Sequence, residues 1–240
     1  MIMKAFVNLH AFTEKGIDSG SLGMLGMVIH RFDEHGDYRL EVYQGENLKR
    51  TIRLKVNKEF KTLQLNIDLA ESQKGPQENC HCKTHNSMDL EMAPQGHVVF
   101  YVSHGAGGYW VSASKVGEKP VNVFDSRELG DNDIFVANII RPGTYSLSNA
   151  LSNAKSKIVV AYPQAGKVRY TPPKALSIEF GQTFKQDVIN LEPAQGQIYR
   201  IKYKSRIKIE LIKADDGPSK KIGVTRWNKL QREPSSQGKQ

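Results

Sequence analysis

Residues 48–56, LKRTIRLKV, and residues 61–69, KTLQLNIDL, both alternate between apolar and polar side chains. In the first run the two faces are Leu48, Ile52, Leu54 and Val56 against Lys49, Thr51, Arg53 and Lys55. The second run follows the turn NKEF and places Leu63, Leu65, Ile67 and Leu69 together. A period of two residues is typical of a strand with one buried face. The stretch therefore predicts a β-hairpin that packs one face on a core.

Similar short runs recur along the chain, and none shows a helical period. Periodicity is lost between Glu71 and Gly96, where Gln, Asn, Ser, Gly and Pro predominate. Short strands separated by turn signals about every 8 to 12 residues favour β-sandwiches. We therefore predict an all-β protein with two tandem β-sandwich domains. The predicted units are a domain over 1–70, a polar linker over 71–95, a domain over 96–214 and a basic tail over 215–240.

The two predicted domains share a short sequence pattern. Residues 35–56 and 142–162 both contain Gly-x-Tyr-x-Leu, then a polar turn and a further strand. Duplication of one domain would produce this likeness, and ordinary hairpin chemistry would also produce it. The pattern alone leaves both explanations open.

Residues 141–163, RPGTYSLSN followed by KIVVAYP, and residues 184–203, FKQDVINLEPAQGQIYRIKY, resemble strands of cupredoxins. The likeness covers roughly residues 120–205. It implies an immunoglobulin-like or cupredoxin-like β-sandwich for the second domain. Cupredoxins normally place a copper-binding cysteine after the Pro-Gly-Thr-Tyr strand, where this chain has Ser148 and Asn149, and no histidine follows His104. The resemblance therefore implies a domain without type 1 copper.

The chain of 240 residues carries a net charge of +9, with 39% hydrophobic and 25% charged residues. From residue 201 onward there are 11 Lys and Arg against 4 Asp and Glu, a surplus of seven. The first residues lack the apolar core of a signal peptide, and no run is long enough to span a bilayer. We therefore expect a cytoplasmic protein without a transmembrane segment, whose basic C-terminal region suits an acidic partner.

The most regular charged pattern lies in YRIKYKSRIKIELIK, residues 199–213. Apolar residues occupy most odd positions, including Tyr203. Five cations occupy even positions, namely Arg200, Lys202, Lys204, Arg206 and Lys208. In a strand they would form one basic face, with a bend or split near Ser205 because a strand through all of them would be unusually long. Trp227 in the basic tail is a further binding candidate.

Two interpretations of the basic face remain. It could be a solvated surface neutralised by neighbours such as Asp187, Glu192 or Glu210. Alternatively it binds a partner, and among partners we favour an acidic protein surface over nucleic acid or another anionic surface. The leading functional prediction is thus a non-enzymatic interaction or assembly module. The acids Asp125, Glu128, Asp131 and Asp133 are expected in an exposed loop, since they lack the spacing of a calcium site.

The segment NCHCKTHNSM, residues 79–88, supports an alternative function in metal binding. Cys82, His85 and Met88 have the spacing of a short copper-ligand loop, and His30 or His35 could complete the set. Cys80, Cys82 and His85, with His81 or a distant His97 or His104, could instead hold zinc. The surrounding sequence favours a polar linker, so no cofactor is the leading prediction and copper or zinc the alternative. No arrangement of residues identifies a catalytic site, and an enzyme is the less favoured class.

Overall fold

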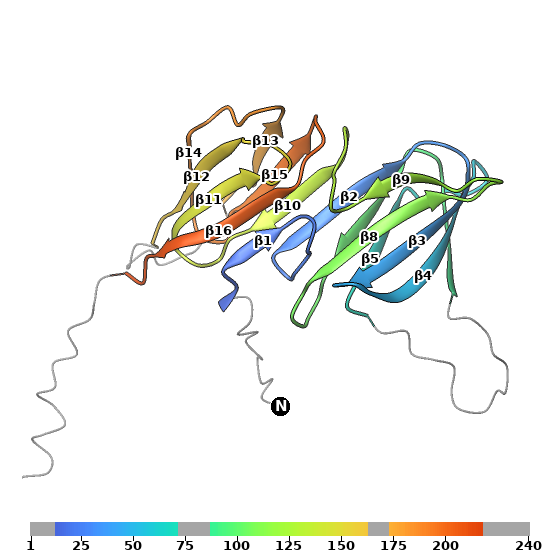
Figure 1. The fold of residues 1–240 in the computed structure, drawn as a ribbon, viewed down its shortest axis with the longest axis horizontal. Helices are drawn as coiled ribbons and strands as arrows, with labels where there is room; N and C mark the ends of the chain where they lie inside the picture. The colour runs from blue at the N-terminus through green and yellow to red at the C-terminus, as the bar shows by residue number, and fades with distance from the viewer. Residues whose placement is uncertain (1–12, 72–86, 163–172, 218–240) are drawn as a thin grey trace, which may run out of the picture.

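The computed structural model describes residues 13–71, 87–162 and 173–217, drawn in colour in Figure 1. The regular secondary structure of these ranges is nearly all β with essentially no helix, so the prediction of an all-β protein is confirmed. The sixteen strands of the described residues are β1 (Gly16–Asp18), β2 (Gly26–Phe32), β3 (Gly36–Gln44), β4 (Asn47–Val56), β5 (Gln64–Asp68), β6 (Ser87–Met92), β7 (Gly96–Tyr101), β8 (Tyr109–Lys115), β9 (Val121–Asp125), β10 (Ile134–Asn138), β11 (Gly143–Asn149), β12 (Lys155–Val160), β13 (Leu176–Phe180), β14 (Val188–Leu191), β15 (Gly196–Ile201) and β16 (Ile207–Ala214).

The strands form three sheets (Figure 1). The central sheet has six strands in the order β13-β15-β10-β2-β7-β5. The first flanking sheet has the order β6-β4-β3-β8-β9, and the second flanking sheet has the order β1-β16-β11-β12-β14. The two flanking sheets lie side by side along the long axis of the molecule, and β2 and β10 meet in the middle.

The predicted tandem arrangement of two β-sandwich domains is wrong. Strands from both predicted domains share sheets: β3 pairs with β8, β2 pairs with β10, and β1 pairs with β16. The chain instead winds as a β-solenoid of about four turns. Two turns run through β4 to β7, because β6 lies parallel to β4 and β7 lies parallel to β5. The other two run through β12 to β15 with the same parallel pairs.

The stretch 48–69 does not form the predicted hairpin. Its two strands lie in different sheets, β4 in the first flanking sheet and β5 in the central sheet. The predicted inward faces are correct in part: Ile52, Leu54, Val56, Ile67 and Leu69 are buried, whereas Leu48 (51%) and Leu63 (62%) are exposed. Periodicity reports which face is buried and not which strand is the hydrogen-bonding partner. The turn after β4 carries the chain from one layer to the other instead of returning it alongside.

The predicted linker over 71–95 also needs correction. Residues 72–86 lie outside the described part of the chain, but Ser87–Met92 forms β6, which pairs parallel with β4. Met92 is fully buried in the core. This segment does alternate, with Met88, Leu90 and Met92 between Ser87, Asp89 and Glu91, but the run is only six residues long and follows a long polar stretch.

Both flanking sheets pack on one face of the central sheet. Paired residues run across that face on all six strands, namely Ile67, Phe100, Val28, Phe135, Tyr199 and Ile178. All six belong to the single hydrophobic core or pack against it. Phe100, for example, stacks on Phe124 of β9 with ring centroids 5.6 Å apart. Because side chains alternate along a strand, residues one position away point to the opposite face, which no described strand covers.

The Gly-x-Tyr-x-Leu pattern marks a structural repeat. Tyr38 Oη donates to the backbone oxygen of Glu34 (2.8 Å), and Tyr145 Oη donates to that of Arg141 (2.7 Å). The preceding glycines, Gly36 and Gly143, have φ of 149° and 152°, a region that favours glycine. The likeness extends beyond one hairpin, because β3, β4 and β6 pair with one another as β11, β12 and β14 do.

The repeats comprise β1–β8 and β9–β16, and an approximate two-fold axis relates them. It passes between β2 and β10, where Val28 faces Phe135 and the flanking pairs are Met27 with Val136 and Ile29 with Ile134. Each repeat also gives its first strand to the other, since β1 pairs with β16 and β9 pairs with β8. This exchange explains why the repeats cannot be separated into consecutive domains.

Candidate functional site

The five predicted cations do not form one row. Arg200 lies on β15 in the central sheet, Lys208 lies on β16 in the second flanking sheet, and the other three lie in the connection between these strands. The expected split near Ser205 is confirmed. The odd positions 199, 201, 207 and 209 are buried as predicted, but Tyr203 is 53% exposed because it lies in the connection and not in a strand.

Four of the five cations are paired with acids. Arg206 binds Asp18 through two contacts of 2.9 Å, Nε to Oδ1 and Nη2 to Oδ2. This hydrogen bonding raises the pKa of Arg206 above its ordinary value. Lys208 Nζ lies 3.7 Å from the same carboxylate, and Lys204 pairs with Glu128. These acids are not the neighbours expected from the sequence. The fourth cation, Lys202, pairs with Asp131 in an exposed contact. Arg200 forms no ion pair among the described residues, so Arg200 and Lys202 are the cations to consider.

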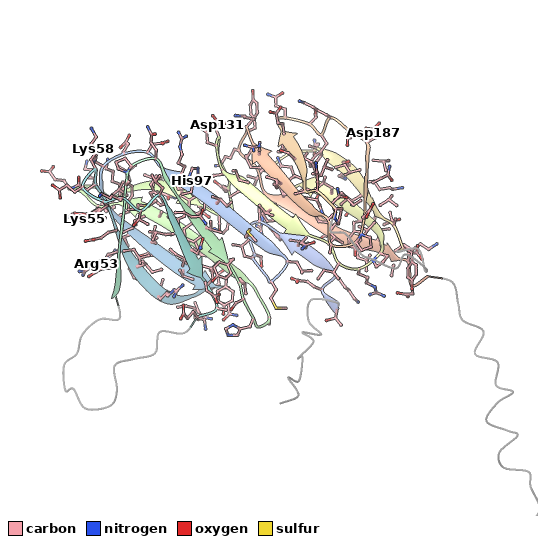
Figure 2. The ribbon with its side chains drawn as sticks, turned by 180° about the vertical axis from the view of Figure 1, so that it is seen from behind. Arg53, Lys55, Lys58, His97, Asp131 and Asp187 are labelled. Atoms are coloured by element: carbon pink, nitrogen blue, oxygen red, sulfur yellow. The ribbon has the colours of Figure 1, made fainter. Side chains whose placement is uncertain are left out.

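Arg200 and Lys202 line a small cavity on the uncovered face of the central sheet. Its volume is about 170 Å³, and its lining includes Arg31 of β2 and His97 of β7. Arg31 and His97 face each other across paired strands, as do Ile134 and Arg200. We call this cavity the cationic pocket; it is lined by Arg31, His97, Asn132, Asp133, Ile134, Arg200, Ile201 and Lys202. Figure 2 shows the molecule from behind and labels His97 of the lining and Asp131, the partner of Lys202.

The cations of the pocket are only weakly neutralised. Lys202 Nζ lies 3.5 Å from Asp131, and both side chains are more than half exposed. Arg31 Nη2 donates to Asp33 Oδ2 (3.1 Å) at a similarly exposed position. Arg200 Nε donates to the hydroxyl of Ser177 (3.3 Å). Exposed ion pairs contribute only about 0–1 kcal/mol, so an incoming acid can compete for these side chains.

Arg31 makes a second contact with the same acid. Its Nε is shielded from solvent and lies 2.7 Å from Asp33 Oδ1, so the Asp33 carboxylate meets two nitrogens of the guanidinium. An anion that enters the pocket therefore competes with Asp33 for Arg31.

The one carboxylate in the lining is used inside the protein. Asp133 is buried, accepts a hydrogen bond from the Gly130 amide (2.7 Å) and lies 2.7 Å from Nδ1 of His30. The His30 ring in turn stacks on Phe124 with centroids 4.4 Å apart. Asn132 adopts φ of 69°, which asparagine tolerates better than most residues, and this turn brings the loop 126–133 into β10. The pocket therefore keeps an excess of positive charge.

A larger hollow of about 830 Å³ lies on the first flanking sheet. Its ionisable lining comprises four acids and four bases: Asp37, Glu41, Asp89 and Glu91 with Arg39, Arg53, Lys55 and Lys115. Paired strands set these charges beside one another, as in Asp37 with Lys55 and Lys55 with Glu91. The balance of charge gives this hollow no preference for an anion or a cation, so the cationic pocket is the more specific candidate.

The remaining predicted binding residues fall largely outside the described part of the chain. This applies to Cys80, Cys82, His85 and Trp227. Met88 lies in β6, where its backbone pairs with Ile52. In the residues that the structure describes, no three His, Cys, Asp or Glu side chains are grouped to hold a metal ion. The copper or zinc alternative therefore stays a prediction.

Sequence reasoning missed Arg31, and it considered His97 only as a distant zinc ligand and not as a neighbour of the cations. The two residues lie 66 positions apart by number, and only the pairing of β2 with β7 brings them together. The one available signal was a single cation at the end of the apolar run GMVIHRF, residues 26–32.

Comparison with known proteins finds no matching family model, no matching curated protein and no matching solved structure. The cupredoxin resemblance therefore stays untested by any relative. Among the described residues, no helix has the length and apolar character needed to cross a membrane.

Proposed function

We propose that this protein is a non-enzymatic interaction module that binds an acidic group of a partner protein in the cationic pocket. The observation that carries the proposal is the lining, in which Arg31, Arg200 and Lys202 gather beside His97 while the only carboxylate is engaged by His30. Arginine is always charged at neutral pH and presents donors in a fork that matches a carboxylate or phosphate.

The size of the pocket supports a group of a larger molecule over a whole small molecule. Pockets that enclose small ligands have volumes of about 300–1,000 Å³. The cationic pocket, at about 170 Å³, is well below this range and suits a single carboxylate or phosphate. The rest of such a partner would lie outside the pocket, on the face of the central sheet.

Hexaglutamate labelled with fluorescein tests the proposal by fluorescence anisotropy at neutral pH. Arg200→Gln and Arg31→Gln should each weaken binding about tenfold, since one charged hydrogen bond is worth about 1.4 kcal/mol. The matched control is Arg53→Gln, which removes an exposed arginine from the balanced hollow and should change binding less than about twofold. Equal effects of all three variants would mean that net charge, and not the pocket, attracts the peptide.

Raising the salt concentration separates two kinds of anion. A carboxylate peptide should lose affinity gradually through screening. Single-stranded DNA of the same length would show the steep dependence of counterion release. If the DNA binds more tightly than hexaglutamate at physiological salt, the proposal of an acidic protein partner fails.

A further inference from the structure

Three strands at the middle of the central sheet read as almost continuous apolar runs. They are GMVIHRF in β2, GHVVFY in β7 and IFVAN in β10. Strands with one solvated face alternate apolar and polar residues, whereas strands covered on both faces read as runs of this kind. In the described structure, only one face of these strands is covered.

The uncovered face carries a contiguous group of apolar side chains. We call it the outer strip: Met27, Ile29, Val99, Tyr101, Ile134, Val136 and Ile198. Strand pairing joins its members, since Met27 faces Val136 and Tyr101, and Ile29 faces Ile134 and Val99. Met27 is 36% exposed and the others are partly exposed. Ile134 also lines the cationic pocket, so the strip and the pocket form one surface.

We propose that the outer strip and the cationic pocket together dock an amphipathic, acidic segment of a partner protein. Its apolar side chains would lie on the strip and its acidic side chain would enter the pocket. The acidic part of this inference rests on the proposed function, whereas the apolar part stands on the strip alone. Contiguous exposed apolar patches of this kind mark interaction surfaces.

Charge favours this occupant over a second copy of the chain. A second copy would bring the same cations to the pocket. Of the acids on this face, Asp68 accepts hydrogen bonds from the amides of Ala70 and Ser103, and Glu179 is paired with Lys185 in an exposed contact of 3.2 Å. Residues 1–12 are mostly apolar but contain no acid, and the region from residue 201 onward is strongly basic.

Three fluorescein-labelled octapeptides test the inference with the full chain. They alternate leucine with glutamate, leucine with lysine, and serine with glutamate. The leucine–glutamate peptide should bind at least tenfold more tightly than either of the others, because only it matches both the strip and the pocket. Equal binding of the leucine–glutamate and serine–glutamate peptides would overturn a role for the strip.

Paired variants assign the two contributions. The double change Met27→Ser and Val136→Ser should weaken the binding of the leucine–glutamate peptide at least tenfold. It should leave the binding of the serine–glutamate peptide unchanged. The matched control is Val121→Ser with Val123→Ser, which removes two exposed valines from β9. This control should change the affinity for neither peptide. If the double strip variant does not fold, Met27→Ser alone makes the same test at the most exposed position.

The outcomes separate this inference from the proposed function. If the strip variant binds like the wild type while Arg200→Gln does not, the strip inference fails and the pocket proposal stands. If Arg200→Gln has no effect while the strip variant does, the pocket proposal fails along with the acidic half of this inference. Sedimentation that reveals a dimer lost in the strip variant would identify a second copy as the occupant. Tighter peptide binding after removal of residues 1–12 would identify that segment. Either result overturns the inference.

Discussion

The two ends of the uncovered face are related by the approximate two-fold axis, yet at the equivalent positions of the described strands only one end carries cations. Val28 corresponds to Phe135 and Phe100 to Tyr199, because these residues pair in equivalent positions. Counting along the strands, Arg31, His97 and Arg200 at one end correspond to Asn138, Gly196 and Tyr101 at the other. The same backbone arrangement therefore carries a charged pocket at one end and a neutral surface at the other. The two ends differ in their side chains.

At a second pair of equivalent positions, Asp18 and Asp125, both repeats keep an ion pair with an arginine. Asp125 pairs with Arg127 two residues later (Nη2 to Oδ2, 2.7 Å), and this guanidinium lies 3.6 Å from the centre of the Trp110 ring. At the corresponding place Asp18 pairs with Arg206, which directly precedes β16, and Gly20 stands where Arg127 would be. A Cβ at Gly20 would lie only 2.6 Å from Arg206 Nε. Here the interaction is kept although a different strand or loop supplies the guanidinium.

The largest difference between the repeats should appear at their equivalent glycines. A Cβ at Gly143 would lie 2.5 Å from the backbone oxygen of Lys213, whereas a Cβ at Gly36 would meet the flexible end of Lys115 at 2.8 Å. Both positions have positive φ, so alanine is strained at each. Gly143→Ala should lower the free energy of unfolding by about 4 kcal/mol and Gly36→Ala by about 2 kcal/mol.

Urea denaturation followed by fluorescence measures both values. Equal losses would mean that the backbone at Lys213 moves aside as easily as the Lys115 side chain. The repeats would then be alike in stiffness at this turn.

A smaller and equal effect is expected at the two tyrosines. Each hydroxyl donates one hydrogen bond to a backbone oxygen, so Tyr38→Phe and Tyr145→Phe should each cost about 1 kcal/mol of unfolding free energy. Burial raises the pKa of both hydroxyls above their ordinary 10.0. The folded protein thus holds these protons more tightly than the unfolded chain. Their contribution is complete below about pH 10 and is lost as the pH rises through the higher folded pKa.

Denaturation at about pH 9 and pH 11 checks the sign. Each phenylalanine variant should lose less stability over this interval than the wild type, because it lacks one of the titrating groups. A variant that loses as much as the wild type would show that the hydroxyl titrates equally in both states.

The sequence predicted local faces and missed long-range partners. The inward positions Ile52 and Leu54 follow from alternation alone, but their sheet neighbours depend on pairings between distant strands. Arg50 interrupts the same run at an inward position and reaches the backbone oxygens of Asp68 and Glu71, close to the end of β5 in another sheet. Nothing in the spacing of Arg50 points to that role.

The candidate site divides in the same way. Arg200 and Lys202 were found because they lie close together in a regular pattern, whereas Arg31 required knowledge of the central sheet. The acids of the loop after β9 were recognised as a group, but their specific cations were not. Asp131 with Lys202 and Glu128 with Lys204 are contacts between separate segments that no local pattern specifies.

The smallest expected effect comes from transferring charge to the neutral end of the uncovered face. The changes Asn138→Arg and Tyr101→Arg place guanidinium groups at the positions equivalent to Arg31 and Arg200. If cations on this backbone frame are sufficient, hexaglutamate should bind at two sites instead of one. The apparent affinity should rise by only about twofold, a statistical factor worth about 0.4 kcal/mol.

Isothermal titration calorimetry measures the stoichiometry directly, and Asn138→Gln with Tyr101→Gln is the uncharged control. A stoichiometry that stays at one would show that cations alone do not make the site. The cavity beside Asn132, with His97 at its rim, would then be the feature that distinguishes the two ends.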